Sequence, residues 1–209
     1  MLPLPEALLL FALHDDKGTV VSSAFLALDH ALRGAILAEL RLRGFVQTRS
    51  DDVLRLHPDP PADPQEPVLA AALAILRGAP DEVPVADALL ALERGLPDLR
   101  DAISASLAQQ GILGESTVER MGLPDDVTHP MTDREQEARL LDLVRGGLND
   151  GDAISPRVGT LVGLTVAAHL EEEVFSDAAA SAKERADWVA GQDAVLRAVR
   201  DAVERVEGW

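Results

Sequence analysis

The chain has 209 residues, of which 47% are hydrophobic and 26% charged, so it is long and apolar enough to bury a core and is not a disordered segment. It contains no cysteine, which excludes disulfide bonds and thiolate metal sites. The formal net charge of −17 argues against a broadly basic binding surface, so any site for an anion must be local. The apolar start at Met1 lacks the basic flank of a signal peptide, and we expect a cytoplasmic protein.

The first predicted elements are helical with one short extended segment. Residues 7–13 are apolar and predict a helix, and the polar turn after them contains Gly18, which can adopt positive φ. The paired valines of residues 19–22 favour an extended conformation. Residues 25–43 carry apolar side chains at a helical period, which predicts a long helix with a wide apolar face that ends at Gly44.

Arg33 lies inside the apolar part of this long helix. A charge in such a place needs a partner or a ligand, because an unpaired buried charge is costly. An ordinary salt bridge to Glu39, to Asp29 or to a carboxylate farther away in the sequence is one interpretation. A site for an anionic ligand is the other.

A small hairpin is expected after the long helix, with strands at residues 45–48 and 53–56. The prolines of residues 57–65 exclude helix and central strand, so this segment is a surface loop. Three helices are predicted after this loop, at residues 68–77, 84–92 and 96–109. The last of them ends at Gly111.

The second half begins with residues 112–127, whose glycines and sparse apolar residues predict a loop or an irregular hairpin. Thr132 and Glu135 match a capping box, with threonine as the N-cap of a helix that reaches about residue 148. The remaining predicted elements are a turn at residues 149–152, a buried helix at 155–169 that is too short to span a bilayer, and one or two terminal helices at 186–206. The predicted fold class is therefore mainly α, a single compact helical domain with short β-hairpins over residues 1–209.

Four sequence blocks occur in order along the chain: residues 4–10, residues 32–44 with the sequence Leu-Arg-Gly at their start, Thr128-His129-Pro130, and residues 161–175. Together they resemble the Golgi phosphoprotein 3 family, over about residues 4–206. The resemblance implies a largely helical, disc-like peripheral membrane domain that recognises phosphatidylinositol 4-phosphate. In eukaryotes, such domains retain glycosyltransferases in the Golgi.

The resemblance also indicates where a lipid head group would bind. Family members surround it with a tryptophan, an arginine on the long helix and two arginines on a later helix. These positions correspond to Ala24, Arg33, Pro97 and Arg100, so two of the four are replaced. Arg33 and Arg100 are therefore the candidate anion-binding residues, because two guanidinium groups can form a fork for a phosphate.

Met121 and Leu123 lie where family members carry apolar hairpin residues, and they are candidates for a contact with a membrane or another subunit. The alternative is that they fold back onto the domain. The resemblance implies a non-enzymatic peripheral membrane or adaptor protein, and the alanine- and arginine-rich composition suggests a bacterial-type member. The expected partners are a phosphoinositide or another anionic ligand, a membrane surface, and a protein partner or second copy. We expect no cofactor and no nucleic acid.

Two other functions compete with this interpretation. The long helix and its hairpin also have the pattern of a winged-helix nucleic-acid binder, although Asp51 and Asp52 lie at the wing tip. The basic residues of that module would be Arg41, Arg43, Arg49 and Arg55.

A hydrolytic or metal-dependent enzyme would have to use His129 or His169. The sequence contains no phosphate-binding loop, nucleophile elbow, dinucleotide fingerprint or paired-histidine zinc motif. A hydrogen bond from His129 to nearby backbone is the simpler role for this residue. His14 and His169 stand beside acidic residues, but chance clustering explains both, and no metal is expected.

Overall fold

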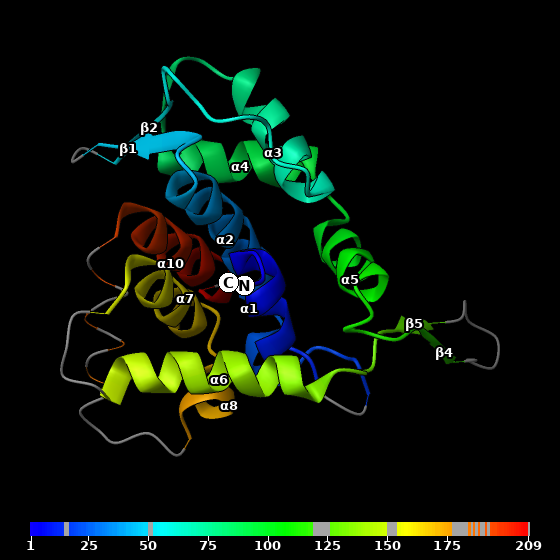
Figure 1. Cartoon of the computed structure of the whole chain (residues 1–209). Coiled ribbons are helices and arrows are strands. Elements are labelled where there is room, and N and C mark those ends of the chain that lie inside the picture. Colours follow the sequence, from blue (N-terminus) through cyan, green and yellow to red (C-terminus); the bar gives the residue numbers. More distant parts are fainter. Residues whose placement is uncertain are drawn as a thin grey trace.

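The structure is a computed structural model that describes residues 1–14, 17–49, 52–118, 126–149, 154–176, 184, 186, 188, 191 and 193–208. It is mainly α, which confirms the predicted fold class (Figure 1). The helices are α1 Leu4–Phe11, the 3-10 turn η1 Ser22–Ala24, α2 Leu28–Leu42, α3 Pro67–Arg77, α4 Val85–Gly95, α5 Leu99–Gln109, α6 Arg134–Asn149, α7 Pro156–Ala167, α8 Glu171–Phe175 and α10 Ala194–Glu207.

Two small antiparallel sheets accompany these helices. The predicted hairpin is confirmed as β1 Val46–Thr48 and β2 Val53–Leu56, and a third strand, β3 Glu82–Pro84, pairs with β2. This third strand was not predicted, because three residues before a helix carry no recognisable strand pattern. The second sheet pairs β4 Ser116–Val118 with β5 Asp126–Thr128, and it extends away from the helices beyond α5 (Figure 1).

Helix α2 forms the centre of the molecule. It contacts α1, α3, α4, α5, α7 and α10, and its apolar residues belong to one continuous core (Figure 1). The wide apolar face predicted from the sequence is confirmed, since the side chains from Ala31 to Leu40 are buried on nearly every side of the helix. The charged side chains of Arg33 and Glu39 on α2 are therefore buried because the residues around them on the helix are apolar.

Helices α2 and α10 lie antiparallel. At one end Arg41 of α2 pairs with Asp193, the N-cap residue of α10, and at the other His30 and Arg205 line one cavity. Between these points the backbone of Gly34 meets Val199, and a Cβ at Gly34 would overlap the Cγ2 atom of that side chain. Glycine at this position thus allows the two helices to approach closely, one residue beyond Arg33.

The long helix starts later than the apolar pattern predicts. Residues 22–27 form a 3-10 turn and further turns, so Phe25 and Leu26 precede α2 instead of joining its buried face. Their side chains are 62% and 52% exposed. The apolar period continues through these residues, but the backbone hydrogen bonds Phe25 N to Ser22 O and Ala27 N to Ala24 O keep them in a separate turn.

The predicted capping box is wrong in its N-cap residue. Asp133 caps α6, because its Oδ1 atom accepts hydrogen bonds from the backbone of Glu135 and Gln136. The Thr132 hydroxyl instead donates to the carbonyl oxygens of Gly111 and Ile112. Tertiary contact with the end of α5 thus takes the threonine away from the helix that follows it.

Gly44 and Gly111, which were predicted to end helices, have positive φ angles of +80° and +72°. Gly18 also has positive φ, and a Cβ there would overlap the backbone of His129 and Pro130. The predicted turn at residues 149–152 falls largely outside the described residues. Ser155 opens α7 as predicted, by accepting a hydrogen bond from Val158 N, but α7 ends at Ala167.

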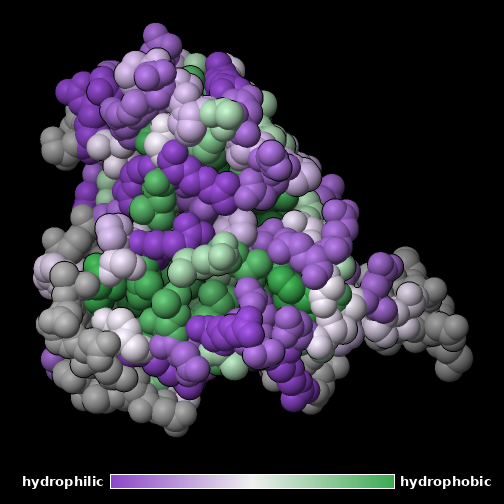
Figure 2. Space-filling model, viewed as in Figure 1, coloured by the Kyte–Doolittle hydropathy of each residue, from purple (hydrophilic) through white to green (hydrophobic). Residues whose placement is uncertain are grey.

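The surface shown in Figure 2 is mostly hydrophilic, with an apolar band over the region of α1, α6 and α7. Met1 and Leu143 are exposed in this region. No helix in the described part of the chain is long and apolar enough to cross a membrane.

The close approach at Gly34 gives a direct test of the packing. Gly34→Ala should lower the free energy of unfolding by about 1–3 kcal/mol, because the new methyl group forces apart α2 and α10. Gly146→Ala is the matched control, since a Cβ there meets open space on α6 and should raise stability by about 0.5–1 kcal/mol. Urea denaturation of both variants measures the difference, and two changes of the same sign would contradict this packing.

Candidate functional site

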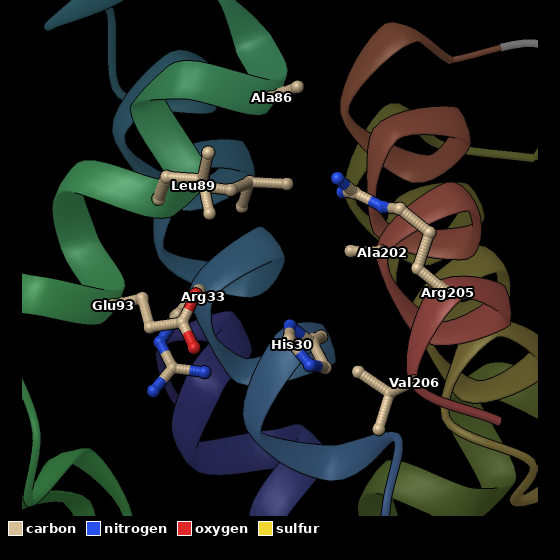
Figure 3. Close-up of a pocket in the computed structure, with 9 residues that line it drawn as sticks. His30, Arg33, Ala86, Leu89, Glu93, Ala202, Arg205 and Val206 are labelled. Atoms are coloured by element: carbon tan, nitrogen blue, oxygen red, sulfur yellow. The ribbon is translucent and has the colours of Figure 1, made fainter. Parts of the chain in front are cut away.

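A cavity of about 490 Å³ lies between α2, α4 and α10 (Figure 3). Its volume is in the range of about 300–1,000 Å³ that is typical of small-ligand sites. Helix α2 contributes the basic residues His30 and Arg33, and α10 adds Arg205. The rest of the described lining consists of Ala86, Leu89, Leu90 and Glu93 from α4 and of Ala202 and Val206 from α10.

Arg33 is the most unusual residue of this cavity. Only 6% of its surface is exposed, and its Nε atom is buried without a hydrogen-bond partner. Among the described residues, no carboxylate forms an ion pair with it, although eight other described arginines have such a partner. A buried guanidinium without an ion-pair partner carries a desolvation cost, which an anion in the cavity would reduce.

Neither carboxylate named as a partner for Arg33 bonds to it. Glu39 is fully buried and accepts hydrogen bonds from the backbone N–H of Leu4, at 2.8 Å, and from the side chains of Arg43 and Arg157. Asp29 accepts two hydrogen bonds from Arg100 through one oxygen. Both carboxylates therefore already have cationic partners, and the interpretation of Arg33 as an ordinary salt bridge to either is not supported.

Arg100 lies outside the described lining of the cavity. Its Nε and Nη2 atoms donate to Asp29 Oδ1 at 3.0 and 2.8 Å, which holds the guanidinium at the start of α2. The structure thus gives Arg33 and Arg100 different surroundings. That the two residues bind one anion stays a prediction, and it would require Arg100 to share or leave Asp29.

Two charged residues face the cavity together with Arg33. Glu93 extends from α4 on the side where Arg33 projects, and Arg205 reaches from α10 toward α4 (Figure 3). The Nε atom of Arg205 donates to the carbonyl oxygen of Asp201 on its own helix. No described carboxylate pairs with Arg205, so the cavity has a guanidinium group on each of two helices.

His30 adds a polar group that is uncharged at neutral pH. Burial, and then the positive charge of Arg33, lower the pKa of His30 from its ordinary value of 6.5, while Glu93 and Asp29 act in the opposite direction. The imidazole can therefore accept or donate a hydrogen bond at pH 7 without adding charge.

Sequence reasoning found Arg33 but missed the residues around it. His30 could have been found, because a residue three positions earlier lies on the same helix face. Arg205 and Glu93 could not, since only the packing of α10 and α4 against α2 brings them to Arg33. Ala24, at the family's tryptophan position, is fully buried, and Pro97 is exposed before α5.

The other candidate residues have the following surroundings. Met121 and Leu123 lie outside the described residues. His129 Nδ1 is 3.3 Å from the carbonyl oxygen of Gly114, which agrees with the predicted bond to backbone. His169 Nε2 is 3.0 Å from a carboxylate oxygen of Glu207. In the ranges that the structure describes, no three histidine or acidic side chains are grouped so that they could hold a metal ion.

The arginines proposed for a winged-helix module interact with the chain itself. Arg41 pairs with Asp193, Arg43 with Glu39 and Glu66, Arg49 with Glu82, and Arg55 bonds to Gln47. These contacts neutralise or occupy the basic side chains that a nucleic-acid backbone would have to contact.

The fold and site define a helical domain whose central helix carries a buried arginine at a cavity. The sequence model of the Golgi phosphoprotein 3 (GPP34) family matches residues 4–206, almost the whole chain. The chain belongs to this family, which confirms the resemblance seen in the sequence. No curated protein matches the chain.

The structural role of the buried Glu39 carboxylate can be measured as a change in the free energy of unfolding. Glu39→Gln should lower the free energy of unfolding by about 3 kcal/mol, because it leaves two arginines without their shared buried carboxylate. Glu66→Gln removes a partly exposed partner of Arg43 and should cost less than about 1 kcal/mol. Chemical denaturation of both variants compares them, and equal losses would show that Glu39 has no special structural role.

Proposed function

We propose that this protein is a non-enzymatic peripheral membrane protein that binds the anionic head group of a lipid through Arg33. The observation that carries the proposal is that Arg33 is buried at the cavity between α2, α4 and α10, has no ion-pair partner among the described residues, and has an Nε atom without a hydrogen-bond partner. Arg33 corresponds to the family's head-group arginine, and its charge-assisted hydrogen bonds are the kind that hold phosphate and carboxylate groups.

Apolar side chains near the cavity support contact with a bilayer. Leu90 and Val206 line the cavity and are exposed. Phe25 and Leu26 are exposed in the turn just before α2, whose first turn contains His30. Exposed apolar residues at the end of a helix can enter the interfacial zone of a membrane, which would bring a head group toward Arg33.

The charge of the chain limits how such binding can work. A net charge of −17 repels an anionic leaflet, so association has to depend on the local contact with Arg33 and on apolar burial rather than on the field of the whole protein. Raising the salt concentration screens the general repulsion. Membrane binding is therefore expected to persist in salt, unlike that of a polybasic protein.

Flotation with phosphatidylcholine vesicles, with and without phosphatidylinositol 4-phosphate or phosphatidylglycerol, tests the proposal. Wild-type protein should float with at least one of the anionic compositions, and Arg33→Met should bind it at least about tenfold more weakly, through loss of a charge-assisted bond. Arg33→Met should also keep the thermal stability of the wild type, because it removes an unpaired buried charge.

Arg100→Met is the matched control. It removes an arginine that Asp29 already engages, so it should retain most of the vesicle binding. Equal losses in the two variants would instead show that Arg100 leaves Asp29 to bind the head group with Arg33. Vesicle binding that is the same in wild type and Arg33→Met would contradict the proposed function.

A further inference from the structure

The walls of the Arg33 cavity are mostly apolar. Helix α4 contributes Ala86 and Leu89 on one side, and α10 contributes Ala202 on the other (Figure 3). Arg33 is nearly buried, whereas Leu90 and Val206 are exposed. A ligand that fills this space therefore needs an anionic group for the guanidinium and an apolar body for the walls, because polar atoms against these walls would lose hydrogen bonds to water.

The charges of the lining limit how negative the ligand can be. Arg33 and Arg205 contribute two positive charges, Glu93 contributes one negative charge, and His30 is neutral at pH 7. The described lining thus has a net charge of about +1. One negative charge balances it, while a phosphate monoester, with about −1.5 to −2, leaves an excess next to Glu93 in an already acidic protein.

We propose that the cavity binds an amphiphilic monoanion, with its charged group on Arg33 and its apolar body between α4 and α10. A free long-chain carboxylate and a bilayer lipid with a single negative charge both have this chemistry. The inference rests on the proposed function in using Arg33 as the anion contact, and it adds the charge and the apolar body of the ligand. Glu93 acts as the residue that disfavours more highly charged groups.

Calorimetric titration with soluble probes tests this inference directly. Decanoate, below its critical micelle concentration, should bind wild-type protein, and butanoate should bind at least about tenfold more weakly because it lacks most of the apolar body. Decyl phosphate at pH 8 has a slightly longer alkyl chain and a second negative charge, and it should nevertheless bind more weakly than decanoate. Inositol 1,4-bisphosphate, which has charge without a chain, should bind most weakly.

Three variants assign the effect to the cavity. Arg33→Met should weaken decanoate binding at least about tenfold, and Arg100→Met should leave it unchanged. Glu93→Gln should strengthen decyl phosphate binding about twofold to fivefold relative to decanoate, because an exposed carboxylate has been removed from the site. Thermal denaturation of each variant checks that the fold is kept.

The outcomes separate this inference from the proposed function. Decanoate binding that needs Arg33 supports a free amphiphile, and Arg33-dependent flotation with phosphatidylglycerol vesicles supports a bilayer lipid as the source. Arg33-dependent binding of decyl phosphate or inositol 1,4-bisphosphate that equals or exceeds that of decanoate would overturn the monoanion inference and leave the proposed function standing. If neither decanoate nor phosphatidylglycerol vesicles bind in an Arg33-dependent way, the inference is wrong even where phosphatidylinositol 4-phosphate binds.

Discussion

The packing around α2 depends on two buried charged side chains, Glu39 and Arg33, which differ in their partners. The Glu39 carboxylate holds the start of α1 through the Leu4 N–H, the end of α2 through Arg43, and α7 through Arg157. Six residues earlier, Arg33 has no ion-pair partner in the described chain. Both side chains are buried on the same helix, but of the two only Glu39 forms ion pairs with described residues. The paired Glu39 carboxylate holds the helices together, and we propose that the Arg33 guanidinium, which has no ion-pair partner among the described residues, binds a ligand.

The position of the cavity follows from long-range packing. Gly34 lets α10 approach α2, and the Arg41–Asp193 pair sets the register of the two antiparallel helices. This register brings the last turns of α10 next to Arg33, and α4 closes the opposite side. Arg100, by contrast, is held by Asp29. Arg33 therefore faces surroundings built by α4 and α10, not by α5.

Local features of the fold could be predicted from the sequence, and features that depend on distant contacts could not. The helix period around Arg33 predicted its burial, and turn glycines such as Gly44 were recognised from local conformational preference. The N-cap was assigned to Thr132 although Asp133 is the cap, because the threonine hydroxyl donates to carbonyl oxygens of the segment that follows α5. Likewise, the presence of Arg205 in the same cavity as Arg33 depends on contact between helices whose residues are more than 170 positions apart in the sequence.

The central claim is that the Arg33 guanidinium contacts an anionic ligand in this cavity. The most direct measurement is of the ¹⁵N and ¹H guanidinium resonances of Arg33 and Arg100 as decanoate, or nanodiscs that contain phosphatidylglycerol, are added. Saturable shifts are expected for Arg33 with either ligand, and little change is expected for Arg100. Arg33 resonances that stay fixed while either ligand binds would contradict the central claim, because the buried charge would then have no part in recognition.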